Sequence, residues 1–331
     1  MGRETIPVFL LPSQKRTSVS PVIFILLAGL FIYFAWLDIA LFITLHFCAN
    51  IPGESIMSSS ISVKSIMLPP TVHYMDDPIS EWLELHFSLS LFFSPNFVSL
   101  LGVLFGLMSA WLVTKGTRST ILGAVFLYKI RDLCDALDGV LARGVGAIIV
   151  PTPGTTGYYV DGWCDVASDT ALILATGYLL ETTKNSPHQK VFNTPSKLGR
   201  WLDPIINHPF MSKILYPISM PIFFLGVQSI LSAVFWNWTT TQLHILLETG
   251  SKGVTEEQVT LFKSSTCWLV MFFWRLLNPH MLSQALLVSF LVDRYKQWVE
   301  QAIVVVSIPL MILCTASSIW IFVLQSKLYW I

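Results

Sequence analysis

Long apolar runs, separated by shorter polar segments, dominate the hydrophobic pattern of this chain. Each is close to the roughly 20 residues that an α-helix needs to cross the hydrocarbon core of a bilayer. We expect residues 262–292 to form one helix kinked at Pro279, because proline interrupts the backbone hydrogen-bond ladder; two shorter segments are the alternative. The pattern predicts an all-α polytopic membrane protein. Six or eight spans are the alternatives to the seven expected ones, which are 22–47, 97–113, 121–141, 158–180, 214–236, 262–292 and 302–324.

The segment between the first two runs divides into two parts. Residues 49–80 are rich in Ser and Pro, which predicts a polar loop. In residues 81–93 the apolar positions recur at helical spacing, which predicts a short helix lying in the membrane interface. The alternative is that this stretch begins the next span. The two faces of the predicted helix are Trp82, Leu85, Leu89 and Phe92 on one side and Glu81, Glu84 and Ser88 on the other.

Composition excludes a soluble protein. Hydrophobic residues make up 53% of the 331 positions and charged residues only 12%, against about 25% charged in soluble domains. The mean hydropathy is +0.64. Lys and Arg together number 20, as do Asp and Glu, so no excess of positive charge favours nucleic-acid binding. The cysteines show no CxxC pairing and are interpreted as packing residues: Cys48, Cys134, Cys164, Cys267 and Cys314.

The distribution of Lys and Arg between the loops predicts the orientation in the membrane. Short cytosolic loops carry an excess of positive charge. The N-terminal segment and every second loop after it hold twelve Lys and Arg residues, whereas the opposite side holds five. We therefore expect a cytosolic N-terminus, with the loops after spans 1, 3 and 5 facing a lumen. The glycosylation sequon Asn237-Trp-Thr239 falls in one of these predicted lumenal loops, which agrees with this orientation.

Six aspartates within 38 residues, where the third run ends and the fourth begins, form the strongest chemical signal. Acidic side chains inside membrane helices are costly unless they are paired or hydrated. Asp135 and Asp138 are three residues apart, and Asp161 and Asp165 are four apart, so each pair projects from one face of its helix. Two adjacent antiparallel helices would point all four carboxylates into one cavity.

Four converging carboxylates require cations, because like charges otherwise repel one another and become protonated. Oxygen ligands suit Mg²⁺ or Mn²⁺, and two such ions would grip a diphosphate. Gly139 and Ala142 would let a ligand approach the helix backbone, and Arg143 would clamp a phosphate. The alternative is a buried ion-pair network through Lys129, Arg131 and Arg143, but three cations are too few for six anions.

Other polar residues near the apolar runs have less definite roles. Asp132 and Asp169 extend the two acidic faces by one turn, where they would tune the metals, bind a cationic head group or be solvated. Arg275, Asn278 and His280 lie in the run 262–292, where they either reach the site or pair structurally. No role is assigned to three histidines that lack metal-ligand spacing, which are His73, His86 and His244.

The spacing of the acidic residues resembles the motif of the CDP-alcohol phosphotransferase family, in which D-x2-D-G-x2-A-R precedes G-x3-D-x3-D. Pro95-Asn96-x2-Ser99 is similar to a second family element, P-N-x2-T, with serine in place of threonine. The resemblance covers residues 80–325. All eight fixed positions of the main motif are occupied, by Asp135, Asp138, Gly139, Ala142, Arg143, Gly157, Asp161 and Asp165.

This resemblance implies a six-helix bundle that dimerises, with one additional N-terminal transmembrane helix. We expect residues 1–50 to contain the cytosolic N-terminus and the extra helix, 51–94 a lumenal loop and the interfacial helix, and 95–331 the membrane domain of the family. It also implies two Mn²⁺ or Mg²⁺ ions and a catalytic role for Asp165, which would deprotonate the acceptor hydroxyl. The implied metal ligands are Asp135, Asp138, Asp161 and Asp165, and the implied CDP-binding residues are Asn96, Ser99, Asp135, Gly139, Ala142 and Arg143.

Two departures from most of the family are similar to its ceramide phosphoethanolamine synthase branch: the extra leading span and the gap of 13 residues between Arg143 and Gly157. That branch implies transfer of phosphoethanolamine from CDP-ethanolamine to the primary hydroxyl of ceramide, with release of CMP, at a Golgi-lumenal site that prefers Mn²⁺. The alternative is an ethanolamine or choline phosphotransferase acting on diacylglycerol, or an enzyme with another acceptor such as inositol.

Two interpretations that do not involve phosphoethanolamine transfer explain less of the sequence. A divalent-cation transporter would account for the membrane carboxylates, but not for glycines, an alanine and Arg143 at fixed spacing from them. A scaffold protein with a decayed site would not be expected to keep every aspartate of the motif. The residue pattern therefore favours an enzyme.

Overall fold

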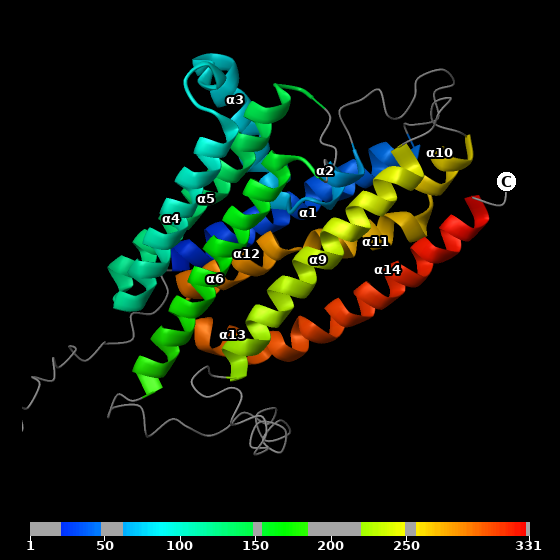
Figure 1. The fold of residues 1–331 in the computed structure, drawn as a ribbon. Helices are drawn as coiled ribbons and strands as arrows, with labels where there is room; N and C mark the ends of the chain where they lie inside the picture. The colour runs from blue at the N-terminus through cyan, green and yellow to red at the C-terminus, as the bar shows by residue number, and fades with distance from the viewer. Residues whose placement is uncertain (1–20, 48–61, 148–153, 185–219, 249–255, 329–331) are drawn as a thin grey trace, which may run out of the picture.

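The computed structural model describes residues 21–47, 62–147, 154–184, 220–248 and 256–328, and all regular secondary structure in these ranges is helical (Figure 1). Among the described residues, the helices long and apolar enough to span a membrane are α1 (Pro21–Phe47), α4 (Pro95–Lys115), α9 (Met220–Glu248) and α14 (Ser307–Leu328). Two further long helices, α5 (Arg118–Arg143) and α6 (Thr156–Lys184), carry the acidic residues of the motif. The helical structure and these spans confirm the predicted all-α polytopic membrane protein.

The helices α4, α5 and α6 lie side by side and position the motif (Figure 1). The Ser94 hydroxyl caps the start of α4 by accepting a hydrogen bond of 3.3 Å from the Phe97 N–H. At the other end Gly116 has a φ of 66°, a left-handed conformation that glycine adopts without steric cost, and the chain turns directly into α5. A Cβ on Gly106 would lie 2.7 Å from the Ser168 hydroxyl, so α4 and α6 meet almost backbone to backbone.

The other part of the fold contains α9, α10 (Glu256–Phe262), α11 (Ser265–Leu277) and α14, and it has an apolar core of its own (Figure 1). Trp236, Met271, Trp274 and Leu310 are central members of this core. A second core joins the α4–α6 group to α9 and to α12 (Pro279–Leu291). The two groups of helices are therefore packed against each other through α9 and α12.

The prediction of one kinked helix over residues 262–292 is wrong. The chain forms α11 and α12 as separate helices, because Asn278 adopts an extended conformation with ψ of 161°. The Asn278 side chain accepts a hydrogen bond of 2.8 Å from the Met281 N–H, and Pro279 occupies the first turn, where its missing N–H costs nothing. A capped helix start therefore replaces the expected kink, and it places His280 at the second position of α12.

The prediction of a polar loop over residues 49–80 is wrong for the part that the structure describes. α2 (Val63–Met67) is followed by the π-helix η3 (Val72–Asp76), and most of the α2 side chains are buried. Side chains from later helices bind the carbonyl groups at the end of α2. Trp236 Nε1 donates to the Met67 carbonyl over 3.2 Å, and Arg275 Nη1 donates to the Ile66 carbonyl over 2.8 Å. Packing on distant elements, rather than local pattern, makes this segment helical.

The predicted interfacial helix exists with different bounds. α3 (Asp77–Phe87) begins four residues before the predicted start and ends at Ser88, whose φ is 49°; a 3₁₀ turn, η4 (Leu89–Leu91), follows. Leu89 and Phe92 are therefore not on the same helix as Trp82 and Leu85. Trp82 and Leu85 are nevertheless exposed, at 50% and 65%, as expected for side chains that face lipid at the interface.

Two other predicted spans have different bounds. α9 continues to Glu248, twelve residues beyond its predicted end, so the Asn237 sequon lies inside a helix and not in a loop. Asn237 Nδ2 donates to the Ala233 carbonyl over 3.0 Å, and Thr239 is completely buried. The last predicted span is divided into α13 (Tyr295–Val305) and α14, which are separated at Val306.

The cysteines of the described residues are unpaired. Cys134, Cys267 and Cys314 are buried, which confirms their interpretation as packing residues, and Cys164 is half-buried. Cys48 lies outside the residues that the structure describes.

Candidate metal centre

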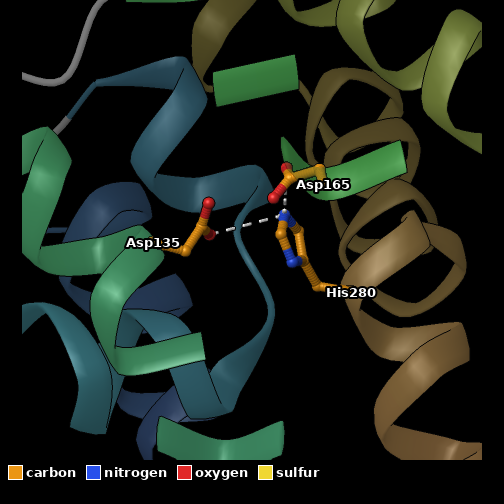
Figure 2. A group of neighbouring side chains, drawn as sticks. All are labelled: Asp135, Asp165 and His280. Atoms are coloured by element: carbon orange, nitrogen blue, oxygen red, sulfur yellow. Dashed lines mark ion pairs between the residues drawn. The ribbon is translucent and has the colours of Figure 1, made fainter. Parts of the chain in front are cut away.

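Three side chains from three different helices converge where α5, α6 and α12 meet. They are Asp135 on α5, Asp165 on α6 and His280 on α12 (Figure 2). His280 Nε2 lies 3.9 Å from Asp135 Oδ2 and 3.9 Å from Asp165 Oδ2. One ligand atom from each residue lies within 4.8 Å of the other two, a spacing that fits a bound metal ion.

The two remaining aspartates of the motif lie beside this group. The carboxyl group of Asp135 adjoins those of Asp161 and Asp165, and Asp138 is close to both Asp135 and Asp161. The buried Ser99 hydroxyl donates a hydrogen bond to Asp138. The four aspartates that the sequence predicts to converge are therefore brought together, and Ser99 contacts one of them.

Basic residues on the inner side of α5 neutralise part of this charge. Arg131 Nη2 donates to Asp165 Oδ1, which leaves Asp165 Oδ2 facing His280. Asp132 lies between Arg131, at 3.1 Å, and Lys129, at 3.5 Å. The ion-pair network weighed as an alternative thus accounts for Asp132 and for one oxygen of Asp165. Among the described residues, no Lys or Arg lies within 4.0 Å of the carboxylate of Asp135.

Asp169 is held by two hydroxyl groups and lies one turn beyond Asp165 on α6. Tyr128 on α5 donates a hydrogen bond to Asp169 Oδ1, and Ser283 on α12 donates another over 2.9 Å. These bonds connect α5, α6 and α12 directly behind the converging carboxylates. They hold the three helices that carry Asp135, Asp165 and His280 in register.

Arg143 folds back over Gly139 at the end of α5. A Cβ on Gly139 would lie 2.7 Å from Arg143 Nη1, so only glycine leaves room for the guanidinium in this position. Arg143 Nε is buried without a hydrogen-bond partner among the described residues. A buried donor without a partner is costly, and an anionic ligand would satisfy it.

The other positions predicted to bind CDP surround this end of the bundle without defined contacts. Asn96 is exposed in the first turn of α4, and Ala142 is exposed beside Arg143. Gly157 stands in open space at the start of α6, since no atom lies within 4 Å of a Cβ built there. The space that these small residues leave is compatible with a bound ligand.

Comparison with known proteins assigns the family. The sequence profile of the family described as "Ceramide phosphoethanolamine synthase" matches residues 55–330. The chain belongs to this family. It is also similar to the ceramide phosphoethanolamine synthase of Drosophila melanogaster, with 29% identity over 247 residues. The match covers 71% of this chain and 61% of the fly protein, so the chain spans less than two thirds of that relative's length. No solved structure matches it significantly.

In this member of the ceramide phosphoethanolamine synthase family, the segment before the motif also reaches the site. Lys64 on α2 lies near Asp161, and Asp77 at the start of α3 lies near Arg143. Asp76, which is 2% exposed, pairs with Lys129 at 2.6 Å. Sequence reasoning missed these residues because it took residues 49–80 as a loop. The apolar spacing of Val63, Ile66 and Met67 was the available signal.

Burial controls the ionisation of these three side chains, which lie outside the membrane-spanning helices. Burial raises the pKa of Asp77 to about 7, although the nearby Arg143 partly opposes the shift. Burial likewise raises the pKa of Asp76 to about 6, and the positive charge of Lys129 partly opposes this shift. Burial lowers the pKa of Lys64, and Asp161 opposes that shift. Of the three, Asp76 is buried, whereas Lys64 and Asp77 are half-buried.

A buried ion pair connects α1 to the rest of the fold. Asp38, in the middle of the apolar helix α1, accepts hydrogen bonds from Arg275 Nη2 at 2.8 Å and from the Tyr74 hydroxyl at 2.7 Å. The Arg275 guanidinium also lies over the Tyr74 ring, 5.1 Å from its centroid. Sequence reasoning weighed a structural pairing for Arg275 and missed its partner, although a lone acidic residue in an apolar span was the signal for it.

Proposed function

We propose that this protein is a metal-dependent phosphoethanolamine transferase that uses CDP-ethanolamine as donor and ceramide as acceptor and releases CMP. The convergence of Asp135, Asp138, Asp161 and Asp165 on two facing helices carries the proposal. Membership of the ceramide phosphoethanolamine synthase family supports the choice of substrates, and the fly relative bears the same name.

The donor set fits divalent metal ions. The four carboxylates and one imidazole offer hard oxygen ligands and one nitrogen ligand, and nearby Lys and Arg residues neutralise only part of their charge. Bound Mn²⁺ or Mg²⁺ would offset the charge of the donor's diphosphate and stabilise the charge that develops on the transferring phosphoryl group. Asp135, Asp138, Asp161 and Asp165 would hold two such ions.

The residues around the carboxylates have distinct parts in the proposed transfer. The ceramide oxygen would attack the phosphorus that bears ethanolamine, and the bond between this phosphorus and the oxygen bridging to CMP would break. Asp165 would take the hydroxyl proton, and Arg131, which donates to Asp165 Oδ1, would hold the carboxylate in position. Arg143, with its unpaired Nε, would hold the diphosphate, and Ser99 would hold Asp138 in place.

The proposal extends to the cellular setting. We propose a Golgi or other secretory membrane, by resemblance to the ceramide phosphoethanolamine synthase branch. We also propose a cytosolic N-terminus and a lumenal active site, supported by the unequal distribution of twelve and five Lys and Arg residues between the loops. We also propose a homodimer, by resemblance to the CDP-alcohol phosphotransferase family. α1 is the helix that would turn the site toward the lumen.

A head-group transfer assay tests the function. Purified protein would receive labelled CDP-ethanolamine and Mn²⁺, with ceramide or diacylglycerol in separate tubes. We expect labelled product and CMP in equal amounts with ceramide, no product with diacylglycerol, and no product with either acceptor after chelation of the metal. Product with diacylglycerol alone would move the enzyme to glycerophospholipid synthesis. Full activity in the chelated sample would refute the metal centre.

Replacing Gly139 by alanine is expected to raise the KM for CDP-ethanolamine about 10- to 100-fold. The new Cβ would lie 2.7 Å from Arg143 Nη1, which is closer than van der Waals contact, so the guanidinium would have to move away from the diphosphate. A hydrogen bond to a charged group contributes about 1.5–3 kcal/mol, which corresponds to this change. Steady-state kinetics measure the effect. Gly226→Ala is the matched control, since its Cβ would meet no atom within 4 Å, and an equal rise in that variant would contradict the explanation.

A further inference from the structure

A nitrogen donor lies beside the carboxylates of the motif. His280 is outside the motif, and its Nε2 is 3.9 Å from Asp135 Oδ2 and 3.9 Å from Asp165 Oδ2 (Figure 2). Hydrogen bonds from nitrogen to oxygen are about 2.7–3.2 Å long, so neither contact is one. The imidazole therefore faces both carboxylates and is bonded to neither.

The distances fit ligands that share one ion. Two ligand atoms that each lie about 2.1 Å from one ion can be at most roughly 4.2 Å apart. Both distances of 3.9 Å from His280 are below this limit, so one ion can contact His280 and either carboxylate. Asp135, Asp165 and His280 also form a set that is close enough to coordinate together.

The face of α12 that carries His280 is fixed toward α5 and α6. Ser283 and Gln284 lie one turn after His280 on the same face and are both buried. Ser283 donates to Asp169 on α6 over 2.9 Å, and Gln284 accepts a hydrogen bond from Thr71. Polar side chains on a largely apolar helix are costly unless they have partners. Ser283 and the side-chain oxygen of Gln284 have partners in the protein, and His280 is left directed at the carboxylates.

We infer that His280 supplies an imidazole ligand to one metal ion of the centre. Nitrogen ligands bind first-row transition ions more strongly than Mg²⁺, which prefers oxygen. The inference deepens the proposed function, because it concerns the same metal centre. The competing possibility is an imidazolium paired with the two carboxylates, in which case the metal would have oxygen ligands only.

Pulsed electron paramagnetic resonance of bound Mn²⁺ tests the inference without enzyme activity. Purified full-length protein, free of any histidine tag, would be stripped of metal and given less than one equivalent of Mn²⁺. We expect a ¹⁴N modulation from one imidazole nitrogen in the wild type, and none in His280→Asn. His86→Asn is the matched control, because His86 is exposed on α3 and bonds to the Trp82 carbonyl. Its spectrum should equal that of the wild type.

Metal affinity gives a second readout. We expect His280→Asn to weaken Mn²⁺ binding about 10-fold or more and to change Mg²⁺ binding much less. Mn²⁺ bound without ¹⁴N modulation in the wild type would overturn the role of His280 while leaving the aspartate centre intact. Absence of any bound Mn²⁺ would overturn both the role of His280 and the aspartate metal centre. A nitrogen-ligated ion in a protein that transfers no phosphoethanolamine would uphold the inference and refute the proposed function.

Discussion

Asp165→Asn is expected to abolish measurable turnover, a loss of about 10²- to 10⁴-fold or more, while the protein stays folded and inserted. The amide cannot accept the proton of the acceptor hydroxyl, and it removes negative charge from the metal centre. It still offers an oxygen to Arg131 Nη2, and Arg131 keeps Asp132 at 3.1 Å, so the buried guanidinium retains partners. Transfer activity and the melting temperature would be measured on the same purified sample.

Two comparison variants separate chemistry from folding. Asp161→Asn should lose activity similarly, and within the described residues no Lys or Arg forms an ion pair with Asp161, although Lys64 lies near it. Asp293→Asn should keep normal activity, because Asp293 is exposed with a φ of 53°, a left-handed conformation that asparagine tolerates. Near-normal turnover in Asp165→Asn would contradict the assigned role.

Breaking the pair between Asp38 and Arg275 is expected to cause the largest loss of stability. Asp38→Leu would leave the Arg275 guanidinium, 2% exposed, with the Ile66 carbonyl but without a carboxylate. Removing one partner of a buried ion pair costs about 3–5 kcal/mol, because the remaining charge stays buried. Thermal unfolding of detergent-solubilised protein would measure the decrease in melting temperature.

The double variant Asp38→Leu with Arg275→Met provides the decisive comparison. It removes both charges, so we expect it to be more stable than the Asp38→Leu variant alone. The coupling free energy in the double-mutant cycle should be about 1–3 kcal/mol. Simple additivity of the two single changes would show that α1 is not held through this pair.

The helices and the converging aspartates were predictable from the sequence because both follow from local spacing. Apolar runs of bilayer length define spans, and aspartates at i, i+3 and i, i+4 share a helix face whatever lies around them. The roles of Gly139 and Arg143 in ligand binding stay predictions, and the contact between the two residues is a feature that only the structure shows.

The parts that could not be predicted depend on distant contacts. α2 is helical because Trp236 and Arg275 bind its carbonyl groups, and neither residue is near it in the sequence. His280 reaches the site because Asn278 begins a new helix, whereas the proline alone indicated a kink. The acidic character of Asp76 and Asp77 suited an exposed loop, and only the fold shows Asp76 buried against Lys129.

The contacts of the N-terminal segments determine which fragments of this protein could be produced intact. A fragment that starts at Pro95 would keep every residue of the motif, yet it would lack Asp76 beside Lys129 and Asp38 beside Arg275. Trp236 and Asn278 would lose the Met67 carbonyl to which both donate. Arg275 and Trp236 would then need new partners in a largely apolar interior, whereas Lys129 would keep Asp132 and Asn278 would keep the Arg275 carbonyl. The smallest unit suitable for crystallisation or reconstitution therefore begins no later than α1.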